Sequence, residues 1–271
     1  MQTIARIAAG LDAARGAGSM AAAMTIWQVF FPCIFGRKPE PPTEPIGLKG
    51  LAMATVRLAD LDLLDVKWWY VWGWGSFTDE RYVPMVRDWS CPAKPAPEYL
   101  LVGNEPNAIE PYGHTMSPEY AVQFLHTLEL AYPDTTMVVG NVSADNWGMG
   151  GDGVWWLTRF LQYYLEANGR PFSHILGCHE YAYSANLAIT QFKRYRAIYS
   201  GRMWLTECNL VQTPIDTAQF REMFQAAGDT FERYACYTNQ QDGGGSSLPY
   251  PMDLCTDGIL TPIGEAYALL G

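Results

Sequence analysis

The chain has 271 residues, of which 49% are hydrophobic and only 17% are charged, and its formal net charge is −10. This composition excludes a disordered chain. The negative charge argues against a nucleic acid or an anionic membrane surface as a partner, because either would repel the protein. The length suffices for one (β/α)8 barrel, which needs roughly 200 to 250 residues.

The first 46 residues differ from the rest of the chain. Residues 19–36 carry no charged side chain and lead into a Pro-rich stretch, residues 37–45, that is typical of an extended linker. A membrane span needs roughly 17 to 25 apolar residues, and a secretory signal has a similar layout, although no A-x-A site closes this one. A signal or anchor, a packed helix and a later translation start all remain open. We expect an extracytoplasmic protein, with any membrane association confined to residues 19–36.

From Gly47 onward, short apolar runs alternate with helical patterns, which indicates successive βαβ units. Apolar runs of this length bounded by turn residues are typical of buried parallel strands. The predicted strands cover residues 50–56, 66–72, 82–86, 99–103, 136–140, 175–178, 203–205 and 234–237. Eight such units predict an α/β fold, a compact (β/α)8 TIM barrel that forms one catalytic domain over residues 47–271.

Four long connections carry helical patterns. The first opens with Ser117 as N-cap and Pro118 at the first helical position, and it ends before Pro133. The other three predicted helices cover residues 154–168, 188–199 and 217–232. The connections after the second and third strands are too short for full helices, so we expect a reduced helix ring in the first half of the barrel.

Two of the predicted strands break off at a glutamate. The fourth strand is followed by Asn104 and Glu105, and the seventh by Glu207. Barrel enzymes place their catalytic groups at the C-terminal ends of the strands. A protonated carboxyl group and an ionised carboxylate about 5 to 5.5 Å apart are what retaining glycoside hydrolysis requires. Glu105 and Glu207 therefore predict a glycoside hydrolase.

Other side chains are expected on the same face. The sixth strand leads to His179 and Tyr181, and the Tyr181 hydroxyl could donate the hydrogen bond that keeps Glu207 ionised. His179 on its own would more often be a structural histidine. Aromatic rings offer large rigid contact faces, and the expected lining of a substrate groove is Trp69, Trp72, Trp74, Trp147 and Tyr183. Burial in the core is the alternative for Trp69.

We expect neither a metal nor another cofactor. None of the four histidines forms a ligand-spaced pair, and the six cysteines show no zinc-binding spacing. Cys178 and Cys236 lie in apolar runs and should be buried thiols, whereas Cys91 and Cys255 lie in predicted loops and could pair in an exported protein.

These motifs resemble a known group of enzymes. Residues 104–106 (NEP) and 206–207 (TE) resemble the retaining clan A glycoside hydrolases, in which the fourth strand carries the acid/base and the seventh the nucleophile. Residues 49–52 (KGLA), 67–73 (KWWYVWG) and 83–85 (VPM) look like glycoside hydrolase family 128, whose members are endo-β-1,3-glucanases. Residues 254–264 (LCTDGILTPIG) resemble an ending common in clan A barrels, so the resemblance spans about residues 47–271.

The resemblance implies roles for individual residues. Glu105 would be the acid/base, Glu207 the nucleophile and Asn104 the group that contacts the sugar 2-hydroxyl. His179 and Tyr181 match the His-x-Tyr motif that positions the nucleophile.

The chain also departs from the clan pattern. Residues 237–240 (YTNQ) stand where many members carry a tryptophan, and Asn107 replaces a frequent aspartate. The first departure bears on the sugar platform and therefore on the substrate. The leading hypothesis is an enzyme that cleaves β-1,3-glucan. The alternatives are a hydrolase of another β-linked polysaccharide (β-1,4-glucan, xylan or galactan) and a carbohydrate-binding barrel without turnover, against which the intact pair of glutamates speaks.

Overall fold

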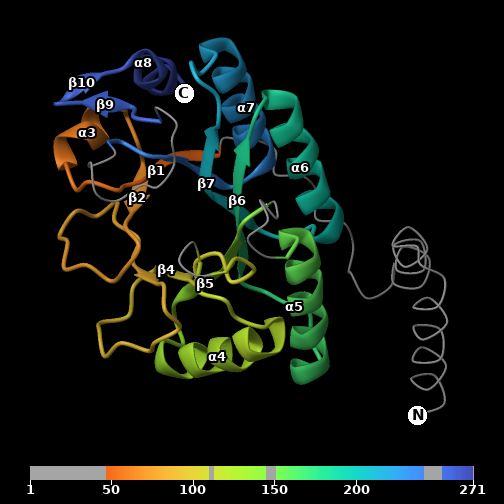
Figure 1. Ribbon diagram of the computed structural model, residues 1–271. Helices are drawn as coiled ribbons and strands as arrows, with labels where there is room; N and C mark the ends of the chain where they lie inside the picture. Colours follow the sequence, from red (N-terminus) through yellow and green to blue (C-terminus); the bar gives the residue numbers. More distant parts are fainter. Residues whose placement is uncertain (1–46, 110–112, 145–150, 241–251, 271) are drawn as a thin grey trace, which may run out of the picture. The chain divides into compact units, whose positions relative to one another are not determined.

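The computed structural model of the protein describes residues 47–109, 113–144, 151–240 and 252–270 (Figure 1). The interpretations of residues 1–46 and the expected role of Trp147 lie outside these ranges. Within them, no helix is both long and apolar enough to cross a membrane. Cys91 is exposed and Cys255 is buried; both are free thiols, so the pairing considered for them is absent.

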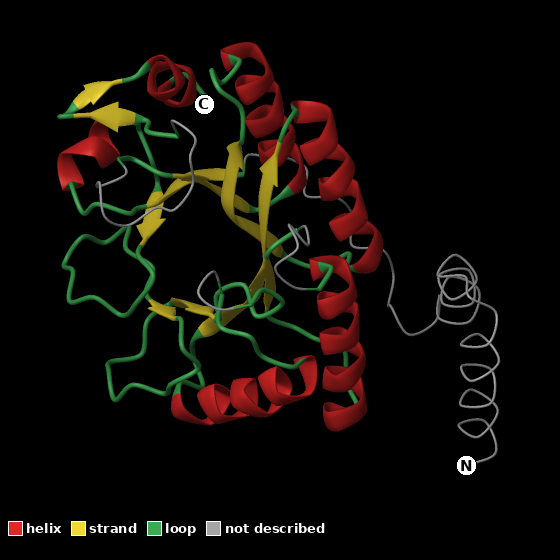
Figure 2. Ribbon diagram, in the orientation of Figure 1, coloured by secondary structure: helices red, strands yellow, loops and turns green. Residues whose placement is uncertain are grey.

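Eight parallel strands form one sheet in the order β2-β1-β8-β7-β6-β5-β4-β3. β1 pairs with both β2 and β8, and an isolated bridge between Trp69 and Tyr82 spans the seam between β2 and β3. The result is a nearly closed (β/α)8 barrel, seen almost along its axis in Figure 2, which confirms the predicted fold. The strands are β1 (Leu48–Ala52), β2 (Trp68–Tyr70), β3 (Met85–Val86), β4 (Tyr99–Val102), β5 (Thr136–Val142), β6 (Ile175–Ala182), β7 (Met203–Leu210) and β8 (Arg233–Tyr237).

The four predicted helices are present. They are α4 (Pro118–Ala131), α5 (Gly153–Asn168), α6 (Ala185–Ile198) and α7 (Thr217–Thr230). The Ser117 side chain caps α4, and Gly169 ends α5 in the left-handed region at φ 63°. The connections from β2 to β3 and from β3 to β4 carry no helix, as expected, and they form the loops on the left of Figure 2. The short elements α3 (Leu58–Leu63), α8 (Pro262–Ala268), β9 (Cys255–Thr256) and β10 (Ile259–Leu260) were not predicted.

The predicted ends of β6 and β7 were wrong. Both strands continue beyond Cys178 and Leu205, to Ala182 and Leu210 respectively. The apolar run stops there because the next residues that face into the barrel are polar. The backbone pairing with the neighbouring strands nevertheless continues. The register between β6 and β7 shifts at Cys178/His179, and that between β7 and β8 shifts after Leu205. Such bulges re-aim side chains at the rims of barrels.

The core has two layers. Alternate strand residues fill the barrel interior, among them Trp68, Tyr70 and Trp204, while the intervening residues pack against the helices. The first strand is also tied to the last helix: the Lys49 ammonium donates to the carbonyls of residues 267, 268 and 270 at 3.1, 3.0 and 2.6 Å. This contact fixes α8 against the start of β1.

Candidate active site

Glu105 and Glu207 lie at the C-terminal end of the barrel. Glu105 follows β4 after two residues, whereas Glu207 lies within β7 and its side chain is almost fully buried. An oxygen of each carboxyl group and Nδ1 of His179 all lie within 4.8 Å of one another. The barrel therefore brings the two predicted glutamates together.

Three neutral donors surround the Glu207 carboxylate. The Tyr70 hydroxyl and the Trp72 indole N–H both donate to Oε1 at 2.8 Å, and the Tyr181 hydroxyl donates to Oε2 at 2.6 Å. Hydrogen bonds from fixed donors hold a carboxylate in one orientation. Glu207 is thus held in place with both oxygens engaged.

Glu105 has a different environment. Its backbone lies in the left-handed region at φ 46°, and its N–H donates to the Asn141 carbonyl at 2.9 Å. The Asn107 side chain braces the same loop by bonding the backbone of Ser143. Burial raises the pKa of the Glu105 carboxyl group, and the neighbouring His179 only partly offsets this effect. About 15% of the side chain is still exposed, so solvent reaches it.

His179 lies between the two glutamates and is fully buried. Its Nδ1 is 3.1 Å from Oε1 of Glu105 and 3.5 Å from Oε2 of Glu207. Burial alone would lower the pKa of His179, but the two carboxylates outweigh it and raise that pKa. The three residues also have the spacing of a metal site. A cation there would compete with the three hydrogen bonds that Glu207 already accepts.

Two other predicted site residues lie at this end of the barrel. Asn104 is buried, and its Oδ1 has no hydrogen-bond partner within the protein, which leaves an acceptor beside Glu105. Tyr183 follows β6 and is half exposed. Trp147 lies outside the described residues.

Trp69 and Trp74 do not line this site, contrary to expectation. Trp69 has no exposed surface, because β2 turns it away from the barrel interior and packs it against Phe77 and Tyr82 at 5.0 and 4.9 Å between ring centroids. Trp74 packs against Tyr132, just before β5 begins, which places it toward the opposite end of the barrel.

Three residues with direct or supporting contacts were assigned no role in the site from the sequence. Tyr70 donates a hydrogen bond to Glu207. Residues two apart on a strand face the same side, so the prediction that Trp72 lies in the site would also have indicated Tyr70. Asn141 accepts a hydrogen bond from the Thr206 hydroxyl at 2.9 Å, which links β5 to the residue before Glu207. The centroid of the Tyr237 ring lies 5.6 Å from that of the Trp72 ring. Tyr237 belongs to residues 237–240, where many clan A members carry a tryptophan.

A closely spaced pair of carboxyl groups in unlike environments, at the C-terminal end of a (β/α)8 barrel, defines the glycoside hydrolase class. The chain belongs to the glycosyl hydrolase catalytic core family, whose model matches residues 50–267. It is therefore a glycoside hydrolase. A search of curated proteins found no match.

Solved structures of glycoside hydrolase family 128 share the fold. A subgroup II endo-β-1,3-glucanase from Sorangium cellulosum is 21% identical with a TM-score of 0.62, covering 83% of this chain and 98% of its own. A subgroup I endo-β-1,3-glucanase from Amycolatopsis mediterranei in complex with laminaritriose is 22% identical with a TM-score of 0.64, covering 83% and 99%. A subgroup VII oligosaccharide-binding protein from Cryptococcus neoformans is 18% identical with a TM-score of 0.59, covering 83% and 94%.

Proposed function

We propose that the protein is a retaining endo-β-1,3-glucanase in which Glu105 is the acid/base and Glu207 the nucleophile. The observation that carries this proposal is the unlike environment of two carboxyl groups with oxygens within 4.8 Å of each other. Burial keeps Glu105 protonated to a higher pH than usual, whereas three donors hold Glu207. Separation of the two roles by environment is how paired carboxyl groups divide acid and nucleophile chemistry.

In the first step, a Glu207 carboxylate oxygen attacks the anomeric carbon while Glu105 transfers its proton to the glycosidic oxygen. The bond from the anomeric carbon to that oxygen breaks, and the leaving sugar departs as a neutral alcohol. The product on the enzyme is a glycosyl ester of Glu207. The hydrogen bonds from Tyr70 and Tyr181 orient the attacking group.

In the second step, Glu105 is ionised and acts as the base. It takes a proton from a water molecule, whose oxygen attacks the anomeric carbon and displaces the Glu207 carboxylate. Both carboxyl groups return to their starting forms, and the released sugar keeps its β configuration. The residual exposure of Glu105 supports this step, because water must reach that side chain.

The choice of β-1,3-glucan is supported by the structural neighbours. Several solved structures that share the fold are described as endo-β-1,3-glucanases, and one holds laminaritriose. Asn104 adds support for a sugar substrate in general, since its unpartnered buried oxygen can accept a hydrogen bond from a hydroxyl next to the reacting carbon.

A binding protein without turnover is the second candidate, because a neighbour from Cryptococcus neoformans is described as oligosaccharide-binding. The chemistry of the site favours turnover. A protein that only binds sugar has no need of two buried carboxyl groups held this close together, because burying them is costly.

The test is hydrolysis of a polysaccharide panel: laminarin, cellulose, xylan and galactan. We expect reducing ends to form from laminarin in excess over the others, and NMR of the first product to show the β anomer. The control is Glu207→Gln, which should lose this activity while retaining its melting temperature within a few degrees. An α anomer as first product would overturn the retaining mechanism. Cleavage of a different polysaccharide would overturn the assignment of β-1,3-glucan as the substrate. Binding without cleavage would favour a binding protein without turnover.

A further inference from the structure

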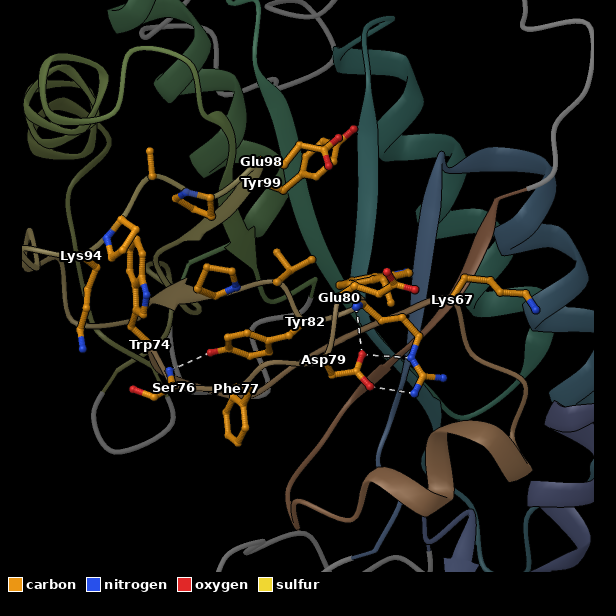
Figure 3. Close-up of a pocket in the computed structure, with 18 of the residues that line it drawn as sticks. Lys67, Trp74, Ser76, Phe77, Asp79, Glu80, Tyr82, Lys94, Glu98 and Tyr99 are labelled. Carbon is orange, nitrogen blue, oxygen red and sulfur yellow. Dashed lines mark hydrogen bonds and ion pairs between the residues drawn. The ribbon is translucent and has the colours of Figure 1, made fainter.

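Figure 3 shows a cavity of about 630 Å³ and the residues that line it. It lies at the end of the barrel opposite Glu105 and Glu207. Lys67 immediately precedes β2, Tyr99 begins β4 and Arg233 begins β8, and all three line it. Because the strands are parallel, their N-terminal ends meet at one edge of the barrel, away from the two glutamates. The cavity is therefore separate from the active site.

The cavity exists because the helix ring is incomplete. The connection from β2 to β3 covers the barrel with aromatic side chains, and Trp74, Phe77 and Tyr82 face the cavity from it. The Tyr82 hydroxyl donates to the Gly73 carbonyl at 2.9 Å and accepts from the Gly75 N–H at 2.8 Å. These two bonds hold the backbone on both sides of Trp74. The aromatic lining is thus preorganised, which reduces the entropic cost of binding a ligand.

The charges around the cavity nearly cancel, and Arg81 also pairs with Asp62, outside the cavity, at 2.9 Å. Arg81 pairs with Asp79 at 2.8 Å, and Lys67 pairs with an aspartate outside the cavity, Asp65. The Arg233 guanidinium lies 4.5 Å from the centroid of the Tyr99 ring in a cation–π contact.

The remaining charged lining residues are Lys94, Glu80 and Glu98, all exposed. Together with Arg233 they make two cations and two anions. In a protein of net charge −10, a nearly neutral cavity that offers aromatic faces with both donors and acceptors suits an uncharged polyhydroxylated ligand.

We infer that this cavity is a second oligosaccharide-binding site, which holds a segment of the same polysaccharide that the active site cleaves. The choice of ligand rests on the proposed function. Tyr99, at the cavity, begins β4, and Glu105 follows the C-terminal end of that strand. The six residues between them span at most about 20 Å. The second site therefore holds a separate chain or a distant part of the polymer, and it anchors the enzyme to insoluble glucan.

The experiment measures binding of laminarihexaose by calorimetry in the Glu207→Gln background, so that the probe is not consumed. Trp74→Ala removes the ring that faces the cavity. The pair Lys94→Ala and Glu98→Ala removes polar groups from its exposed edge, where folding is not at risk. Tyr163→Ala is the matched control, because Tyr163 is also half-buried against the core but lies on α5 outside the cavity.

We expect two equivalents of laminarihexaose per protein, and at least tenfold weaker binding of one of them in Trp74→Ala and in the Lys94/Glu98 variant but not in Tyr163→Ala. In the active enzyme, Trp74→Ala should lower the rate on insoluble glucan several-fold relative to the rate on laminarihexaose. One equivalent in every variant would overturn the inference. Trp74-dependent binding in an enzyme that does not hydrolyse laminarin would uphold the cavity site and overturn the glucanase proposal. Hydrolysis of laminarin by an enzyme that binds a single equivalent of laminarihexaose would uphold the glucanase proposal and overturn the cavity site.

Discussion

Glu105 and Asn141 both adopt left-handed backbone conformations, with φ of 46° and 47°. For most residues other than glycine, including Glu105, this conformation costs about 1 to 2 kcal/mol, whereas asparagine adopts it more readily. The strain is held by bonds among the site's own strands: Glu105 N–H to the Asn141 carbonyl, and the Asn141 side chain to the Gly103 carbonyl and the Thr206 hydroxyl. Both glutamates are therefore positioned by the same asparagine.

Azide should rescue the two glutamate variants with opposite stereochemistry. In Glu105→Ala the nucleophile remains, so azide attacks the glycosyl ester and gives a β-glycosyl azide from an activated aryl glycoside. In Glu207→Ala no ester forms, and any azide product has the α configuration. NMR of the products distinguishes the two. Swapped configurations would reverse the roles of the glutamates, and equal rescue of both variants would rule out a retaining mechanism.

Removal of His179 should shift the pH profile upward. His179 opposes the burial that raises the pKa of Glu105, so in His179→Ala the pKa of Glu105 rises further. Activity in the first step needs protonated Glu105, and the alkaline limb of kcat/KM should move to higher pH while the maximum falls. Tyr181→Phe is the control, since the Tyr181 hydroxyl contacts Glu207 instead. A limb that moves to lower pH in His179→Ala would contradict the assignment.

Loss of the Tyr70 hydroxyl should reduce turnover more than substrate affinity. A hydrogen bond to a charged group contributes about 1.5 to 3 kcal/mol, so Tyr70→Phe should lower kcat roughly 10- to 100-fold with little change in KM. Tyr164→Phe is a matched control: this buried tyrosine also donates to a glutamate, Glu129, but far from the site. Unchanged kcat in Tyr70→Phe would show that the contact is only structural.

Tyr70 also shows where inference from sequence stops. The run from Trp68 to Trp72 is apolar on both faces, so hydrophobicity does not indicate which residues point into the barrel. A shift of one residue exchanges the two faces. The structure turns Trp68, Tyr70 and Trp72 inward and Trp69 outward. Glu105 and Glu207 were identifiable because each interrupts an apolar run.

At the scale of the elements, the end of α5 tests how much a single backbone conformation contributes. Gly169 has φ 63°, and an added Cβ would meet no atom within 4 Å. Gly169→Ala should therefore destabilise the protein by about 1 to 2 kcal/mol through backbone strain alone, or by several degrees in melting temperature. Gly73→Ala is the control, since Gly73 has equally open surroundings without positive φ. Equal effects of the two substitutions would contradict this account.

The elements were predictable to the extent that local patterns define them. Helices α4 and α5 carry cap signals in their own residues, Ser117 and Gly169. The extensions of β6 and β7 carry no such local signal. Their inward-facing residues His179 and Glu207 are polar because they belong to the site, and they interrupt the apolar run. Pairing with neighbouring strands keeps the backbone extended there, and such pairing is not local information.

At the scale of the whole molecule, stability should fall in acid. The Asp79 carboxylate, bonded to Arg81, has its pKa lowered to about 2 from 3.8. A lowered pKa contributes stability above the unfolded value, and that contribution is lost as the pH falls through the folded value. Melting temperature should therefore drop between about pH 4 and 2. Asp79→Asn should flatten this drop, and an unchanged slope would show that other carboxylates dominate it.

The closure of the barrel has a consequence for biosynthesis. β1 lies between β2 and β8, and Lys49 on β1 bonds carbonyls at the end of α8. The second edge of the first strand is therefore paired only after residues 233–270 have been made, near the end of synthesis. Until then this edge is unpaired, and an unpaired edge promotes aggregation. A nascent chain that ends before Arg233 should stay sensitive to protease on the ribosome. In stalled chains that carry a C-terminal linker to fill the exit tunnel, protection should arrive abruptly once residues up to Leu270 have emerged.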